Sequence, residues 1–240
     1  MTLRELLRGT WRFLTFREFR PAPGTLHLWL LWGLACTWLA GIGRYWDHPR
    51  ALWWQSLGLG SLAYVLVLSL MLWLLLLPLR TQVGRYPQIL LFVTLTAPPA
   101  FLYAIPVERW LPMAQAAAVN AWFLGIVAIW RVALWAHFLV KAARLPNGAV
   151  LCVVLLPLTI IVTALASLNL EHVVFAIMSG IRDEQRSAAD ASYTIVLLLT
   201  YLSLLSLPFV LLGYLFYAVK AFRERGLQES APDDDPPRRR

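Results

Sequence analysis

Six long apolar stretches run along the chain, separated by short segments that hold nearly all of its charged residues. A helix rises about 1.5 Å per residue, so stretches of this length cross, or nearly cross, a hydrocarbon core of about 30 Å. The pattern therefore predicts an all-α integral membrane protein whose core is a bundle of six transmembrane helices. The expected spans are residues 26–43, 56–79, 88–105, 114–140, 149–170 and 194–219.

A shorter, amphipathic pattern precedes the first span. Between residues 2 and 20, leucine and tryptophan recur at the spacing of one helical face, and arginine recurs at every fourth position beside them. Such a helix suits the headgroup boundary of a bilayer, and Pro21 and Pro23 are expected to end it. We therefore expect residues 1–23 to form a cytoplasmic helix on the membrane surface. Its apolar face comprises Leu3, Leu6, Leu7, Trp11 and Leu14, and its basic row comprises Arg4, Arg8 and Arg12.

Composition agrees with the membrane assignment. Hydrophobic residues make up 60% of the 240 positions, charged residues only 14%, and the mean hydropathy is +0.64. A chain with so little polar surface does not fit a soluble domain. The net charge of +8 does not indicate nucleic-acid binding, because the basic residues are confined to the breaks between apolar stretches. Anionic lipid headgroups are the expected partners of this charge.

The distribution of basic residues predicts the orientation. Fifteen Lys and Arg residues fall on the side of the N-terminus and five on the other, with Arg131 inside a span. The positive-inside rule then places both termini in the cytoplasm. The use of 19 Arg against 2 Lys suggests a GC-rich bacterium, and hence its inner membrane. The cytoplasmic set is Arg4, Arg8, Arg12, Arg17, Arg20, Arg80, Arg85, Lys141, Arg144, Lys220, Arg223, Arg225, Arg238, Arg239 and Arg240.

The remaining segments are expected to be simple. Residues 24–222 form the six-span domain, and residues 223–240 form a charged, disordered cytoplasmic tail with little to bury. Residues 169–192 form the sizeable loop on the outer side. Cys36 and Cys152 fall in spans at different depths, so a disulfide between them is not expected.

Polar residues in the fourth span form the main candidate site. Arg131 lies about 15 Å, by helical rise, from the cytoplasmic end of this span, and a charge at that depth is costly. Asn120 lies eleven residues earlier on nearly the same helical face, and His137 lies closer to the interface. A polar stripe toward the bundle interior is one interpretation, in which hydroxyls or freed backbone carbonyls pair with Arg131. A side chain that extends to lipid phosphates is the other.

Prolines give a second pattern. Pro98 and Pro99 interrupt the third span, and Pro208 interrupts the sixth. In a chain of two inverted three-span halves these breaks would occupy matching positions, as in many transporters. Pro157 also interrupts the fifth span, however, so kinks for packing are the simpler explanation.

No sequence motif for catalysis or for a cofactor is present: there is no Gly-x-Ser-x-Gly, His-Glu-x-x-His or Walker-type sequence. None of the thirteen Asp and Glu residues lies well inside a span, which argues against a carboxylate relay. A weak metal-binding possibility is an outer-face cluster of Asp47, His48, Glu171 and His172.

These features favour a non-enzymatic membrane protein that acts as a scaffold or as a partner subunit of a membrane complex, with a homo-oligomer as one form. The alternative is a transporter or channel for a small solute or a lipid, using the stripe of Asn120 and Arg131 and the Pro-broken spans.

Overall fold

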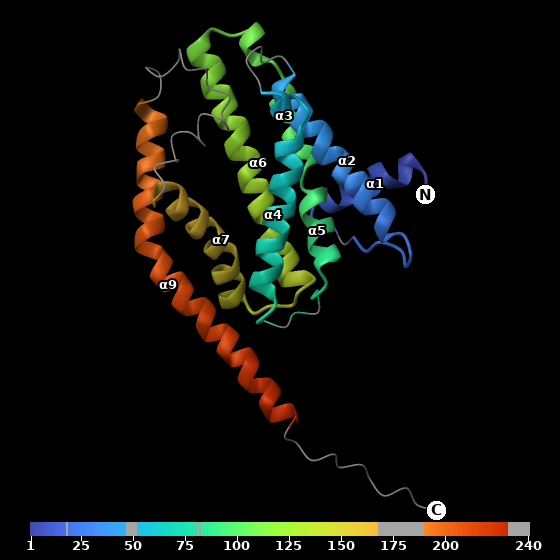
Figure 1. Cartoon of the computed structure of the whole chain (residues 1–240), viewed down its shortest axis with the longest axis vertical. Helices are drawn as coiled ribbons and strands as arrows, with labels where there is room; N and C mark the ends of the chain where they lie inside the picture. The colour runs from blue at the N-terminus through green and yellow to red at the C-terminus, as the bar shows by residue number, and fades with distance from the viewer. Residues whose placement is uncertain (18, 47–51, 80, 82, 168–189, 230–240) are drawn as a thin grey trace, which may run out of the picture.

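A computed structural model describes residues 1–17, 19–46, 52–79, 81, 83–167 and 190–229. The regular structure in this part of the chain is entirely helical (Figure 1). The elements in chain order are α1 (Leu3–Leu14), α2 (Leu26–Tyr45), α3 (Trp53–Ser56), α4 (Leu59–Leu76), α5 (Tyr86–Leu95), the 3₁₀ helices η1 (Pro98–Ala104) and η2 (Val107–Arg109), α6 (Met113–Lys141), α7 (Asn147–Ser167) and α9 (Asp190–Glu229).

Among the described residues, six helical segments are long and apolar enough to cross a membrane, as the hydrophobic pattern predicted. Five of them are α2, α4, α6, α7 and α9, and the other combines α5 with η1. These segments suggest a multi-pass membrane protein. The expected loop at residues 169–192 and the end of the charged tail lie largely outside the described residues.

Several expected boundaries were wrong. The second span begins at Leu59 rather than at residue 56, because Gly58 adopts a left-handed conformation (φ 68°) that separates α3 from α4. A Cβ at Gly58 would lie 2.8 Å from the Trp38 carbonyl oxygen, so this turn requires glycine. The last helix continues to Glu229, so residues 223–229 are helical and do not belong to the tail.

The expected extent of the N-terminal helix was also wrong. Helix α1 ends at Leu14, well before Pro21, because Phe16 is left-handed (φ 59°). The Arg17 amide then donates to the Arg12 carbonyl and the Phe16 amide to the Phe13 carbonyl, which is the pattern of a Schellman motif. Glycine usually occupies this position. The Phe16 ring instead packs edge-on against the ring of His137.

The bundle has two ends, which we name after residues that lie there. The Lys141 end holds the last turn of α6 and the first turns of α2 and α5, and the Trp110 end holds Trp110 and the last turn of α2. Helices α2, α4 and α5 pack together, α6 contacts η1, η2 and α7, and α9 packs chiefly on α7 (Figure 1). Several of the fully buried side chains lie in the half near the Lys141 end, among them Leu76, Ile89, Leu134, Leu139, Val153 and Leu156.

Small residues allow the helices to approach closely. A Cβ at Gly33 of α2 would lie 2.7 Å from Thr94 Cβ of α5, and a Cβ at Gly213 of α9 would lie 2.8 Å from Cys152 Sγ of α7. Close approach of this kind increases dispersion contact, which is the main attraction between helices where water is excluded. Cys36 and Cys152 are both free thiols.

Tryptophan side chains connect distant segments by donating to carbonyl oxygens near element ends. Trp130 Nε1 donates to Leu14 O at 3.0 Å, Trp38 Nε1 to Leu57 O at 2.8 Å, and Trp46 Nε1 to Ala104 O at 3.0 Å. Terminal carbonyls have no partner within their own helix and need one wherever water is scarce. These tryptophan hydrogen bonds thus help to hold together segments that are distant in the sequence.

Candidate functional site

The candidate site forms where Arg131 of α6 meets the break between α5 and η1. A continuous helix would need backbone N–H groups at residues 98 and 99, and prolines have none. The chain tightens there instead, and the Ala100 amide donates to Ala97 O at 2.8 Å rather than to Thr96 O. Arg131 Nε donates to Thr96 O at 3.1 Å. The arginine therefore caps the broken helix, and its acceptor is of one of the kinds that the sequence left open, a freed backbone carbonyl.

Two residues that the sequence did not bring to this site interact with Arg131. Arg44, near the end of α2, and Tyr103, in η1, both lie within electrostatic range of the Arg131 guanidinium. The Arg44 guanidinium carbon lies 5.3 Å from the centre of the Tyr103 ring, a cation–π distance. Charge counting had placed Arg44 in an outer loop, although it is the penultimate residue of the first span.

The three polar residues predicted on α6 do not form one site. Asn120 shares the helical face of Arg131 but lies about 16 Å away along the axis. Its side chain is half-buried and takes part in an interaction of its own. His137 lies about 9 Å from Arg131 toward the Lys141 end, on a different face, where its ring contacts Phe16 with centroids 5.6 Å apart.

The prolines that the sequence paired are also apart, and α9 continues without a break through Pro208, where a break was expected. Pro99 is buried and Pro98 half-buried beside the Arg131 contact, whereas Pro208 is exposed on α9, which packs chiefly on α7. The buried Pro157 lies inside α7, which continues through it. Only the break of the third span therefore lies at Arg131, and two matching breaks around one site, as a transporter of inverted repeats would have, are not observed.

The outer-face cluster of Asp47, His48, Glu171 and His172 lies outside the described residues. Within the described part of the chain, no three His, Cys, Asp or Glu side chains come together as metal ligands would.

Hydroxyl groups buried in the spans bond mainly to their own helices. Thr37 donates to Gly33 O at 2.9 Å, Thr94 to Leu91 O at 2.9 Å, and Thr96 to Val93 O at 2.7 Å. Ser69 differs, because its hydroxyl also contacts the Tyr86 hydroxyl at 3.1 Å, between α4 and α5. These hydroxyls bond within the protein, which is a structural use, whereas the buried hydroxyls of Thr163 in α7 and Thr200 in α9 have no hydrogen-bond partner among the described residues.

In the part of the chain that the structure describes, the arrangement is that of a helical protein with six candidate spans and an arginine-capped helix break. In comparisons with protein families, curated proteins and solved structures, the chain matches none of them.

Proposed function

We propose that the chain is a multi-pass protein of a bacterial inner membrane that has no catalytic activity and serves as a scaffold or partner subunit of a membrane complex. The charge asymmetry supports an orientation with both termini in the cytoplasm, which puts the Lys141 end on the cytoplasmic side. The structural use of Arg131 and of the buried hydroxyls supports a role without chemistry of its own.

The observation that carries this proposal is the length of α9. Tyr217 of α9 packs against Gly148, the second residue of α7, so this contact marks the end of the α7–α9 pair. Helix α9 continues for twelve residues beyond Tyr217, about 18 Å, and extends past the other helices (Figure 1). In the proposed orientation these residues, 218–229, extend toward the cytoplasm, and we name them the arm; the candidate span ends within them, at Glu224.

The arm presents apolar side chains among charged ones. Val219 and Phe222 are 57% and 70% exposed, while Lys220 and Glu224 form an exposed ion pair at 3.9 Å. Both side chains lie beyond the contact with Gly148 but within the candidate span Leu198–Glu224, so an apolar surface, either lipid or the core of a protein interface, is suited to cover them. The arm therefore supports attachment to another subunit or to a second copy.

Purification in mild detergent, followed by native mass spectrometry, tests this proposal. The wild-type chain is expected in a complex of fixed stoichiometry, and Val219→Ser with Phe222→Ser is expected to release it as a monomer. Lys220→Ser with Glu224→Ser changes the other side of the same arm and should leave the complex intact. A monomeric wild-type protein that transports a solute into liposomes would refute the scaffold.

Transport of a small solute or a lipid is the second candidate. It is favoured by the polar group of Arg131, Arg44 and Tyr103, which lies within the candidate spans beside a Pro-broken helix. Flux measurements in liposomes distinguish the two functions, since a transporter would lose flux in Arg131→Met and a scaffold would show none in either protein.

A further inference from the structure

Helix α1 is fixed to the side of the bundle. Trp32 Nε1 of α2 donates to Thr10 Oγ1 at 2.9 Å, and Trp130 Nε1 of α6 donates to Leu14 O at 3.0 Å. Phe13 packs edge-on against Phe92 of α5, with ring centroids 5.6 Å apart. Thr10 and Leu14 are buried by these contacts. Three helices therefore hold α1 in one position.

The apolar face expected from the sequence is divided between two surroundings. Leu6 and Leu14 pack on the bundle, whereas Leu3, Leu7 and Trp11 are 62%, 53% and 63% exposed. The three exposed side chains follow one another at intervals of four residues and form a continuous row. The packing of α1 against the protein thus leaves a complete apolar row uncovered.

A basic row adjoins the apolar one. Arg4, Arg8 and Arg12 each follow a member of the apolar row by one position, and all three are exposed. The only acidic residue of α1 is Glu5, which forms a capping box with Thr2: Thr2 N donates to Glu5 Oε2 at 2.8 Å. The exposed side of α1 is therefore both apolar and cationic.

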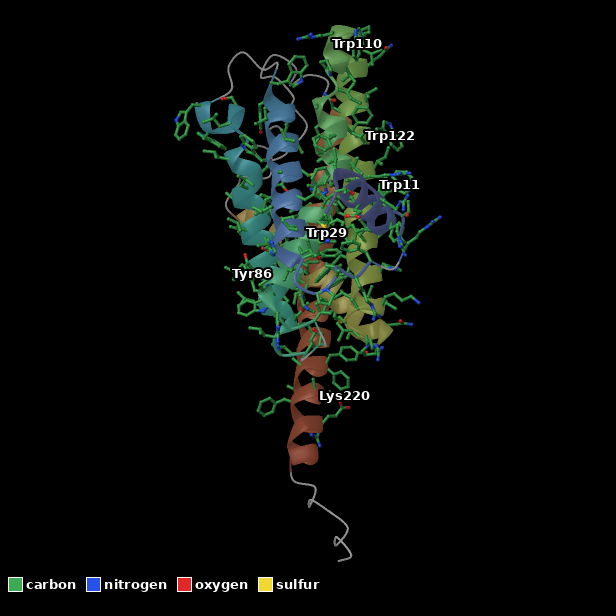
Figure 2. The ribbon with its side chains drawn as sticks, turned by 90° about the vertical axis from the view of Figure 1, so that its right-hand side faces the viewer. Trp11, Trp29, Tyr86, Trp110, Trp122 and Lys220 are labelled. Atoms are coloured by element: carbon green, nitrogen blue, oxygen red, sulfur yellow. The ribbon has the colours of Figure 1, made fainter. Side chains whose placement is uncertain are left out.

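The position of α1 along the length of the spans determines whether lipid or water surrounds these two rows. The contacts with Trp32 and Phe92 lie about 9 Å from the first residues of α2 and α5, and the contact with Trp130 lies about 16 Å from Lys141. Figure 2 shows the same placement, with Trp11 at a level between Trp122 and Trp29 and well above Tyr86. Helix α1 therefore lies alongside the spans rather than beyond their ends. Half of a hydrocarbon core is about 15 Å thick, so α1 is at the depth of one leaflet.

We propose that α1 and the adjoining bundle form a binding site for an anionic phospholipid, whose acyl chains pack on Leu3, Leu7 and Trp11 and whose phosphate is bound by Arg4, Arg8 and Arg12. The site rests on the membrane location in the proposed function. Successive arginines four residues apart are separated by about 6 Å along the helix, so two of them can share one phosphate. Their long side chains can reach the headgroup layer while the row beside them stays in hydrocarbon. Because the contacts with α2, α5 and α6 hold α1 in one position, the lipid binds at one defined place on the protein.

Lipid retention tests the site on the full-length protein. Wild-type protein in nanodiscs of equal parts phosphatidylglycerol and phosphatidylethanolamine is extracted into detergent, and native mass spectrometry measures the retained lipids. Enrichment of phosphatidylglycerol is expected, and it should fall about tenfold in a triple variant with Arg4, Arg8 and Arg12 each changed to Gln. The matched control changes Arg238, Arg239 and Arg240 to Gln, which removes the same charge elsewhere and should retain the lipid.

Equal loss of phosphatidylglycerol in both triple variants, or no enrichment of phosphatidylglycerol in the wild type, would overturn the site. Detection of a bound protein in place of lipid would also overturn it. Alkaline carbonate extraction of the wild type tests the proposed membrane location separately. If the protein resists this extraction, it is in the membrane, and the outcomes above concern the lipid site alone. A second measurement does not depend on the arginine-to-glutamine variants. In a Cys36→Ala, Cys152→Ala background, a spin label at Leu7→Cys should be relaxed mainly by oxygen, and one at Arg8→Cys more strongly by a water-soluble nickel complex. Equal relaxation by the nickel complex at both positions would also overturn the site.

Discussion

Among single residues, Arg131 has the most specific contact in the candidate spans. We expect Arg131→Met to lower the free energy of unfolding by about 1–3 kcal/mol, because the Thr96 carbonyl loses its charged donor where little water can replace it. Unfolding of the purified protein in detergent micelles, followed by circular dichroism, measures the effect.

The matched variant is Arg131→Lys, which keeps the charge and one flexible donor and should lose less stability than Arg131→Met. An Arg131→Met variant as stable as the wild type would contradict the capping role. It would mean that the cost of keeping a guanidinium inside the span is as large as the stability gained from its hydrogen bond to Thr96.

For Arg131, the sequence indicated which kinds of group it could bond but not which residues lie next to it. A lone arginine in an apolar stretch suggested hydroxyls, freed backbone carbonyls or lipid phosphates as its partners, and only the structure shows that the Thr96 carbonyl is the acceptor. The roles of Arg44 and Tyr103 depend on how α2 and η1 are placed beside α6, and helical periodicity does not contain that information.

Among elements, the packing of α2 on α5 depends on a glycine. We expect Gly33→Ala to cost about 1–3 kcal/mol, because its new methyl group would lie 2.7 Å from Cβ of the fully buried Thr94. Gly125→Ala is the control, since no heavy atom lies within 4 Å of a Cβ at that position of α6. It should be neutral or raise stability by up to about 1 kcal/mol. Thermal unfolding of both variants in one detergent provides the comparison, and equal losses would contradict this account of the α2–α5 contact.

The elements themselves were predicted well where an apolar run was long and poorly where one residue had an unusual conformation. The Pro-Pro pair correctly marked the break of the third span. Nothing in the pattern indicated that Phe16 would adopt the left-handed conformation and end α1 early, because phenylalanine rarely does so. That conformation depends on the fold, in which Phe16 meets His137 on α6.

For the whole molecule, the hydrophobic pattern predicted six candidate spans but not which spans pack against each other. The pairing of α9 with α7 separates Pro208 from Arg131 and weakens the analogy with inverted-repeat transporters. The division of α1 into a bundle-facing side and an exposed side likewise requires the positions of α2, α5 and α6, which are tertiary information.

The orientation of the whole molecule follows from charge and can be measured directly. In the Cys36→Ala, Cys152→Ala background, a single cysteine is placed at Trp110, which is 69% exposed, or at the exposed Asn147 that begins α7. In the proposed orientation, which rests on fifteen basic residues against five, Asn147 faces the cytoplasm, so a membrane-impermeant maleimide should label Trp110→Cys in intact cells and Asn147→Cys only after lysis. Reversed labelling would place α1 and its arginines in the outer leaflet. The arm of α9 would then face away from cytoplasmic partners, so this measurement constrains both proposals.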